Sequence, residues 1–184
     1  MTDLHEIAVE SRYVPGQPMN VKKTTLIVES FIDPSAILGP RSVAWHYSRI
    51  LAKVVIGADC SIGGGSEIGA DTSIGDRSRI GANVFLPPRT TIGADVFIGP
   101  NVTCTDDKHP RCGNADYLAE PPTIEDHVSI GAGAVILPGI RIGHHAKVGA
   151  GAIVTRDVPA HGFVRCEPAR AARPSTAALG WIHA

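Results

Sequence analysis

The chain has 184 residues, of which 43% are hydrophobic and 5% aromatic, and its 17 lysines and arginines balance 18 aspartates and glutamates. This length suits one domain with a buried core, and the charge balance gives no indication of a nucleic-acid groove. No apolar run is long enough for a membrane span, and the polar N-terminus does not resemble a signal peptide. We therefore expect a cytoplasmic protein that neither inserts into membranes nor binds nucleic acid.

The pattern divides the chain into three parts. Residues 1–25 contain Pro15, Gly16 and Pro18 and show no periodicity, which predicts an irregular N-terminal lead-in. Residues 26–159 carry a six-residue repeat that is interrupted at 104–123. Residues 160–184 lose the repeat, so we expect a C-terminal tail whose part near 171–181 forms a short cap. An uncapped end would expose unpaired strand edges.

Within residues 26–159, every sixth residue is aliphatic or alanine. An α-helix repeats every 3.6 residues and a strand every 2, so this period indicates a repeated unit of one short strand and one corner. The positions are Ile32, Leu38, Ala44, Ile50, Ile56, Ile62, Ile68, Ile74, Ile80, Leu86, Ile92 and Ile98, then Ile124, Ile130, Ile136, Ile142, Val148 and Val154.

Two further columns support the same unit. A small or β-branched residue lies two positions before most of the aliphatic ones, as at Ser66 and Val84, and a glycine follows many of them, as at Gly81. Both inward positions can fill a narrow prism, and glycine permits a tight corner. Three hexads make one 18-residue coil, which predicts an all-β parallel β-helix of about six coils, four over 32–103 and two over 124–159.

The interruption from Cys104 to Thr123 is too long for a corner. Loops of this length in a compact repeat are usually functional or disordered. Its charges, its His109 and its exit directly after a coil favour a functional loop. The four cysteines of the chain have neither disulfide nor zinc-site spacing, so we expect reduced, structural thiols.

The 18-residue period also predicts which outward side chains stack. Tyr47, Gly65, Asn83 and Asn101 occupy equivalent positions one coil apart. Neighbouring coils lie about 4.8 Å apart, so the two asparagines should reach a single ligand. We expect one side of the prism to collect the residues Trp45, His46, Tyr47, Asn83, Asn101 and His109.

The chain resembles the hexapeptide-repeat acyltransferases, and among them the N-acetyltransferases of nucleotide-linked 3-amino sugars. The matching segments are AWHYSRI from Ala44, IGANV from Ile80, DVFIGPNVTCTDDKHPR from Asp95, IGAGAVILPGIRIG from Ile130 and VGAGAIVTRDVPA from Val148. The resemblance implies left-handed coils, a homotrimer, and acetyl-CoA as co-substrate in clefts between neighbouring prisms. It also implies an acceptor such as a nucleotide sugar, and it places Asn83 near the reacting thioester.

The same resemblance indicates where the coenzyme lies. Its pantetheine arm would run along the coils, where we expect contacts with Gly131, Ala132 and Gly149. Near the C-terminal end, cationic side chains could meet the CoA phosphates. The candidates are Lys147, Arg156, Arg165 and Arg170.

His109 departs from the amino-sugar subgroup, which usually has an aromatic residue at this position. The related sugar-hydroxyl acetyltransferases carry a catalytic histidine beside a proline. A hydroxyl acceptor needs a general base, and imidazole titrates in the right range. His109 therefore either helps to deprotonate an ammonium group or indicates an O-acetyltransferase. His46, Asp106 and Asp107 are further candidates for contact with the acceptor.

Two alternatives stay open. The γ-class carbonic anhydrases share this prism and bind zinc through histidines, and His127 and His145 stack at 18-residue spacing beside His144. The ligand spacing of that family is not recognisable, so we expect no metal. A prism of this kind can also serve as a trimeric scaffold without enzymatic activity.

Overall fold

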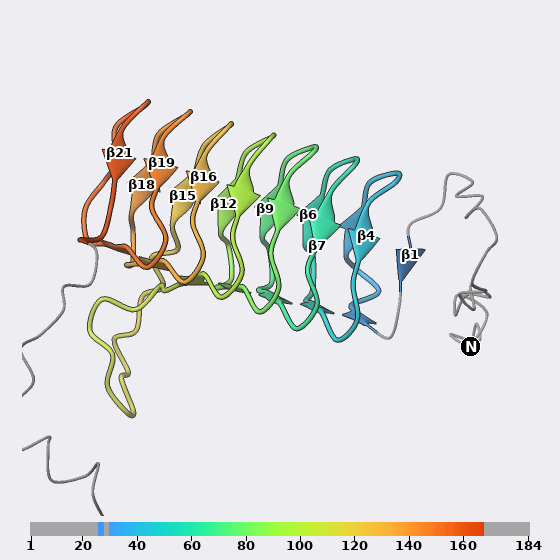
Figure 1. Ribbon diagram of the computed structural model, residues 1–184. Helices are drawn as coiled ribbons and strands as arrows, with labels where there is room; N and C mark the ends of the chain where they lie inside the picture. Colours follow the sequence, from blue (N-terminus) through green and yellow to red (C-terminus); the bar gives the residue numbers. More distant parts are fainter. Residues whose placement is uncertain (1–25, 28–29, 168–184) are drawn as a thin grey trace, which may run out of the picture.

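The computed structural model describes residues 26–27 and 30–167. These residues form 21 two-residue strands and no helix, and strands from successive coils pair in parallel (Figure 1). The predicted all-β parallel β-helix is confirmed. The predicted lead-in 1–25, the cap near 171–181 and the candidate Arg170 lie outside the described residues. No helical segment of the described part has the length and apolar character needed to cross a bilayer.

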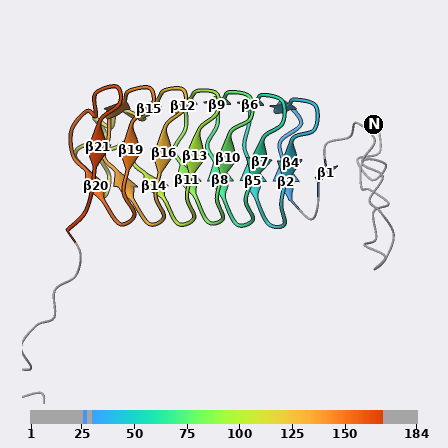
Figure 2. The same ribbon diagram turned by 45° about the horizontal axis from the view of Figure 1, so that its top comes forward.

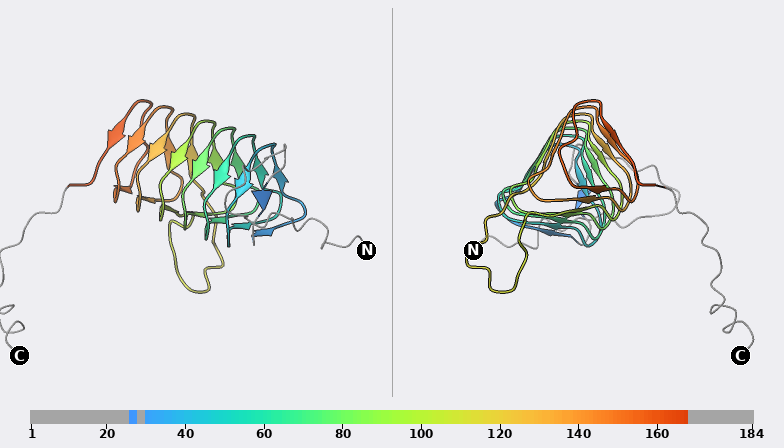
Figure 3. Two further views of the ribbon diagram at one scale, coloured as in Figure 1. Left: turned by 45° about the vertical axis from the view of Figure 1, so that its right-hand side comes forward. Right: turned by 90° about the vertical axis from the view of Figure 1, so that its left-hand side faces the viewer.

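The strands form three sheets, whose rows of strands run along the molecule in Figure 2 and form the three sides of a triangular prism in the right-hand view of Figure 3. The eight-stranded sheet contains β1 (Leu26–Ile27), β4 (Val43–Ala44), β7 (Ser61–Ile62), β10 (Arg79–Ile80), β13 (Phe97–Ile98), β16 (Ser129–Ile130), β19 (Lys147–Val148) and β21 (Phe163–Val164). The seven-stranded sheet contains β2 (Phe31–Ile32), β5 (Arg49–Ile50), β8 (Glu67–Ile68), β11 (Phe85–Leu86), β14 (Thr103–Cys104), β17 (Val135–Ile136) and β20 (Ile153–Val154). The six-stranded sheet contains β3 (Ile37–Leu38), β6 (Val55–Ile56), β9 (Ser73–Ile74), β12 (Thr91–Ile92), β15 (Thr123–Ile124) and β18 (Arg141–Ile142).

The coils are left-handed. The chain passes from the eight-stranded to the seven-stranded and then to the six-stranded sheet. Seen from the C-terminal end in Figure 3, this path turns clockwise as it approaches the viewer. Parallel strands are ordinarily connected by right-handed crossovers, so this fold is an exception to that rule. The handedness implied by the family resemblance is thereby confirmed.

Aliphatic side chains fill the prism along its axis. Ile62, Ile98 and Ile130 are completely buried, and each stacks on the equivalent residue of the next coil, as Ile80 does on Ile98. The outward residue of each strand from β2 to β21 is at least partly exposed, as at Phe97. The core therefore forms one continuous column in which every coil completes the packing of its neighbours.

Buried hydroxyl groups fit this core because they bond to the next coil. Ser66 Oγ donates to the carbonyl of Gly81 at 2.8 Å and accepts the N–H of Val84 at 3.1 Å. Ser78 Oγ repeats the pattern with the carbonyl of Gly93 at 2.9 Å. Among the described residues, every buried side-chain nitrogen or oxygen has a hydrogen-bond partner. The small inward positions thus link the coils as well as fill space.

Each coil turns at three corners, where the third residue after a buried aliphatic has a positive φ. The asparagine corner joins the eight- and seven-stranded sheets and comprises Tyr47, Gly65, Asn83, Asn101, Gly133 and Gly151. The loop corner joins the seven- and six-stranded sheets and comprises Lys53, Asp71, Arg89 and Gly139. The histidine corner joins the six- and eight-stranded sheets and comprises Arg41, Asp59, Arg77, Asp95, His127, His145 and His161.

We expect Ile98→Ala to lower the free energy of unfolding by about 2–5 kcal/mol, because it leaves a cavity in the continuous core. Ile153→Ala removes the same atoms from a side chain that is 64% exposed, and should cost at most about 0.5 kcal/mol. Denaturant unfolding of both variants at one protein concentration checks the prediction. Equal losses in the two variants would contradict the inward placement of Ile98.

Candidate functional site

The predicted acceptor and thioester residues of the repeat lie at the asparagine corner. Asn83 and Asn101 occupy adjacent coils, and Asn83 Nδ2 donates to Asn101 Oδ1 at 3.4 Å. Both side chains are exposed. The stack of two amides that the 18-residue spacing predicts is therefore present, and a ligand can reach both amides.

The backbone explains part of the residue choice at this corner. Asn83 and Asn101 have φ values of 54° and 58°, in the left-handed region that asparagine and glycine tolerate best. Gly65 and Gly133 occupy equivalent positions in other coils. Asparagine therefore has a conformational reason to be here. The presence of asparagine alone is therefore no evidence for ligand binding. The evidence for a chemical role is that the two amides are exposed and paired.

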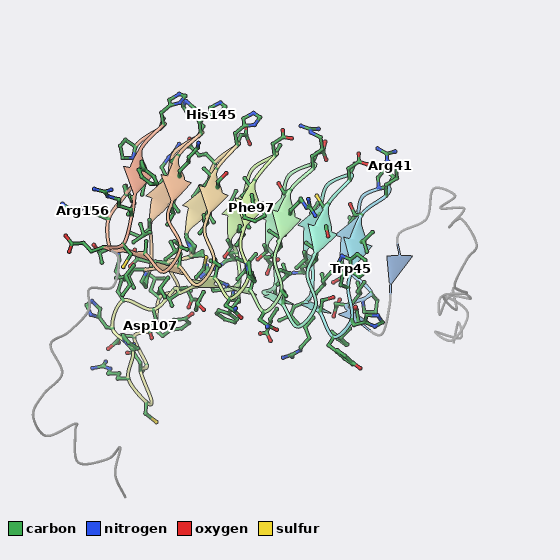
Figure 4. All side chains as sticks on the ribbon, in the orientation of Figure 1. Arg41, Trp45, Phe97, Asp107, His145 and Arg156 are labelled. Carbon is green, nitrogen blue, oxygen red and sulfur yellow. The ribbon has the colours of Figure 1, made fainter. Side chains whose placement is uncertain are left out.

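Three rings stand at the N-terminal end of the asparagine corner. Trp45 Nε1 donates to Ser61 Oγ at 3.0 Å, and the rings of His46 and Tyr47 lie 6.1 Å apart. Trp45 is 45% and Tyr47 72% exposed. Figure 4 shows Trp45 near the N-terminal end of the prism, far along its axis from Asp107. These residues can contact a ligand that extends along the corner toward the N-terminus.

The C-terminal part of the same corner is almost free of side chains. The predicted coenzyme residues Gly131, Ala132 and Gly149 lie there, and Gly133 and Gly151 take its left-handed positions. None of these residues carries a group larger than methyl. An extended ligand can therefore lie directly against the backbone of these coils.

The predicted phosphate-binding cations do not share one face. Lys147 points outward from β19 in the eight-stranded sheet, and Arg165 directly follows β21 in the same sheet. Arg156 follows β20 in the seven-stranded sheet and lies at the C-terminal end of the prism (Figure 4). All three are exposed. Lys147 and Arg165 therefore lie nearer to the asparagine corner than Arg156 does.

The long loop, residues 105–122, leaves from the loop corner between β14 and β15 (Figure 1). Hydrogen bonds hold its base. Glu120 N donates to the carbonyl of Asp106 at 2.7 Å, Gly139 N donates to the carbonyl of Glu120 at 2.6 Å, and Arg89 Nη2 donates to the carbonyl of Ala119 at 3.1 Å. The two ends of the loop are thus fastened to each other and to the prism.

Side chains organise the rest of the loop. Tyr117 Oη donates to Asp106 Oδ2 at 2.7 Å, and this bond raises the pKa of Tyr117, so the phenol stays protonated and continues to donate. Asp107 Oδ1 accepts the backbone N–H of His109 at 2.8 Å. Lys108 forms an ion pair with Glu120. These contacts fix the backbone on both sides of the exposed His109.

A hollow lies between this loop and the outer face of the seven-stranded sheet. Carboxylates and a lysine from the loop meet apolar side chains from the sheet there. It is lined by Phe85, Thr105, Asp106, Asp107, Lys108, Pro110, Leu137, Pro138 and Thr155. Since Glu120 already pairs with Lys108, Asp106 and Asp107 give the hollow negative character. The sequence reasoning missed Phe85 and Leu137, although Phe85 sits at an outward position one coil before the loop exit.

The two groups of predicted residues border the seven-stranded sheet from opposite edges. Asn83 and Asn101 precede its strands, at the asparagine corner, whereas Asp106, Asp107 and His109 follow β14, at the loop corner. The sequence predicts His109 on the same side of the prism as the asparagines, but the two groups lie at different corners. Within one chain, the width of this sheet separates the amides from the loop.

Comparison with known proteins supports the family suggested by these features. The profile of the bacterial transferase hexapeptide (six repeats) matches residues 71–106 and 121–156, and that of the hexapeptide repeat of succinyl-transferase matches residues 53–87. A hexapeptide-repeat acetyltransferase from Vibrio cholerae O1 biovar eltor, solved with acetyl coenzyme A, is 31% identical with a TM-score of 0.50, over 70% of this chain and 68% of that one. This chain belongs to the hexapeptide-repeat transferase family.

Two other similarities define how far the relationship extends. A 2,3,4,5-tetrahydropyridine-2,6-dicarboxylate N-acetyltransferase from Staphylococcus aureus is 50% identical over 52 residues, which are 28% of this chain and 22% of that enzyme. The chain thus spans about a fifth of the length of the curated relatives it matches. A hexapeptide transferase family protein from Anaplasma phagocytophilum, 18% identical over 83% of this chain and 84% of that one, shares the fold with a TM-score of 0.53.

This hexapeptide-repeat transferase also carries the stacked histidines seen in its sequence. The rings of His127 and His145 are parallel, with centroids 4.5 Å apart. His161 extends the stack, and His144 lies edge-on to both His145 and His161. Among the described residues, no three His, Cys, Asp or Glu side chains are arranged to hold a metal ion.

The two buried cysteines of the transferase lie in the core. Burial raises the pKa of Cys104 to about 12, and it also raises the pKa of Cys60. Neither thiol is therefore a thiolate near neutral pH, and neither is suited to carry an acyl group. Acyl transfer at this transferase's surface would have to proceed without these cysteines.

We expect Asn83→Gly to leave the stability of the transferase nearly unchanged, because glycine occupies the same position at Gly65 and Gly133. Alanine adopts the left-handed backbone conformation less readily than asparagine or glycine, so Asn83→Ala should lower the free energy of unfolding by about 1 kcal/mol. Denaturant unfolding of the two variants compares these costs. If alanine were as stable as glycine here, the conformational account of the corner would be wrong.

Proposed function

We propose that this chain is an acetyl-CoA-dependent N-acetyltransferase whose acceptor is the amino group of a nucleotide-linked sugar. The observation that carries the proposal is the negatively charged hollow beneath the loop, with Asp106 and Asp107 beside the exposed His109. It lies in a chain of the hexapeptide-repeat family, which includes an acetyltransferase solved with acetyl coenzyme A. A relative of part of the chain is named as an N-acetyltransferase.

The charge of the hollow selects the end of the acceptor that enters it. Asp106 and Asp107 attract an ammonium group and repel a diphosphate. Phe85 and Leu137 offer apolar surface to the carbon face of a sugar ring. The amino sugar would therefore occupy the hollow, and the nucleotide would lie outside it.

The chemistry needs a free amine and a polarised thioester. His109 accepts a proton from the ammonium group, and the neutral amine attacks the thioester carbonyl carbon. In the resulting tetrahedral intermediate the oxyanion accepts a hydrogen bond from the Asn83 amide. The nitrogen of the intermediate then loses a proton to solvent, the C–S bond breaks and the amide product forms. The CoA thiolate leaves and takes the proton that His109 accepted. No acyl-enzyme intermediate is required, consistent with the buried, protonated cysteines.

Assembly brings the two halves of this site together. Asn83 and the loop border opposite edges of one sheet, so a single chain presents them apart. In a homotrimer with rotational symmetry, the loop of one copy can lie against the asparagine corner of the next. Acetyl-CoA would then occupy the cleft between copies, along the backbone at Gly131, Ala132 and Gly149, with its phosphates toward Lys147 and Arg165.

A second candidate is transfer to a sugar hydroxyl. His109 favours it, because an alcohol must lose its proton during attack and an exposed imidazole can accept that proton. Asp106 and Asp107 favour the amine, because a neutral hydroxyl gains less from two carboxylates than an ammonium group does.

Acetyl-CoA should raise the apparent melting temperature of the protein in a concentration-dependent manner, because a ligand of the native state stabilises it. CoA thiol release should then occur with at least one member of a panel of nucleotide amino sugars. The matched control is the corresponding sugar with a hydroxyl in place of the amine. Turnover with the hydroxyl compound alone would establish an O-acetyltransferase. The absence of a thermal shift with acetyl-CoA would favour a scaffold without enzymatic activity.

His109→Asn should lower kcat by about 100-fold, the scale on which general-base loss is usually felt. The residual activity should also lose the acidic limb of the pH–rate profile that histidine protonation produces. Cys112→Ser, an exposed substitution in the same loop, is the control and should retain activity. An unchanged profile in His109→Asn would rule out a role for His109 as the base.

A further inference from the structure

The histidine corner changes its chemistry along the prism. In its N-terminal half each cation is followed by an anion one coil later: Arg41 pairs with Asp59, and Arg77 Nε and Nη2 donate to Asp95 at 2.8 and 2.6 Å. Alternating charges stabilise a column of exposed side chains about 4.8 Å apart. This half of the corner therefore holds its coils together at any pH at which its carboxylates are ionised.

In the C-terminal half three imidazoles follow one another. The rings of His127 and His145 lie 4.5 Å apart at 7°, and those of His145 and His161 lie 5.0 Å apart at 6°. His144 meets His145 and His161 edge-on, at 5.7 and 5.2 Å. Figure 4 shows His145 in the row of side chains along the upper edge of the prism. Neutral rings stack favourably at this spacing, whereas imidazolium ions repel.

The charged groups around this stack lie at its margins. Asp95 Oδ2 is 3.9 Å from His127 Nδ1. Glu125 Oε2 is 3.3 Å from His144 Nδ1, and Glu125 is itself paired with Arg141. The carbonyl of Asp126 accepts the backbone N–H of His145 at 3.0 Å, and the charge of its carboxylate favours the protonated form of His145. His145 therefore lies between two imidazoles.

The surroundings of His145 favour its neutral form. Desolvation, followed by the neighbouring His127, His161 and His144, lowers the pKa of His145 from its usual value of 6.5, and Asp126 opposes this only in part. The unfolded chain consequently binds this proton more readily than the folded one. The contribution of neutral His145 to the stability of the folded state is therefore complete above about pH 6.5. It is lost as the pH falls from there toward the lowered pKa of His145.

The stack ends on the last described coil. His161 N donates to the carbonyl of His144 at 2.9 Å, and β21 pairs only with β19 within the described residues. Among the described residues this coil has one neighbouring coil instead of two, and a coil with one neighbour opens at lower cost than an inner coil. Repulsion between protonated imidazoles would therefore act on the coil that opens most easily.

We propose that His127, His145 and His161 form a proton-sensitive clasp that holds residues 156–164 against the prism when the rings are neutral and releases them when the rings are protonated. The released segment directly follows Thr155, which lines the hollow beneath the loop. Acidification would therefore loosen one wall of that hollow. The clasp itself does not depend on the proposed activity.

Amide hydrogen exchange of the full chain, followed by mass spectrometry at about pH 7.5 and about pH 5.5, tests the clasp. After correction for intrinsic exchange, protection of residues 156–164 should fall by about tenfold or more at the lower pH, while residues 79–98 keep theirs. His145→Asn combined with His161→Asn should remove this loss, since asparagine keeps the left-handed corner as at Asn83. His109→Asn is the control for a histidine outside the stack. In this variant residues 156–164 should lose exchange protection at the lower pH to the same extent as in the unaltered chain.

Unchanged relative protection of residues 156–164 in the unaltered chain would overturn the proposal, and this measurement needs no variant. The same loss persisting in the double variant would overturn it as well, because another group would then be responsible. Both outcomes are independent of acetyl transfer, so failure of the clasp and failure of the proposed function are distinguishable.

Discussion

The structure depends on one local constraint, a corner that turns the chain every six residues. At most corners the third residue after the buried strand residue takes a left-handed backbone conformation, and its N–H bonds to the preceding coil, as from Asn83 to the carbonyl of Gly64 at 3.0 Å. Next to the corner the coils touch: a Cβ on Gly81 would lie 2.5 Å from the nitrogen of Pro100. The aliphatic column stays in register because each turn has the same length and each coil rests on the last.

This constraint also decides where chemistry can be placed. A corner residue points outward and repeats one coil later, so a corner presents a column of side chains rather than a pocket. The three columns differ: amides and bare backbone at one corner, a folded loop at the second, and ion pairs that give way to imidazoles at the third. The loop adds a hollow to these columns where it folds back over the seven-stranded sheet, beside Asp106 and Phe85.

The fold and the amide stack were predictable because both follow from counting. The six-residue period predicts the strands, and the 18-residue length of a coil predicts that Asn83 lies beside Asn101. The interior of the loop has no period, so the Tyr117 to Asp106 hydrogen bond could not be foreseen. His161 lies 16 rather than 18 residues after His145, so regular spacing misses it, and only the shortened last turn brings it into the stack.

The central claim is that the site joins the asparagine corner of one copy to the loop of another. Co-expression of Asn83→Gly and His109→Asn chains tests it directly, since each variant alone should be nearly inactive. In mixed trimers assembled at random, about a quarter of the sites would combine an intact asparagine with an intact histidine, and acetyl transfer should recover to about that fraction. If the mixed trimers stay as inactive as the parents, the two residues do not meet across a subunit boundary.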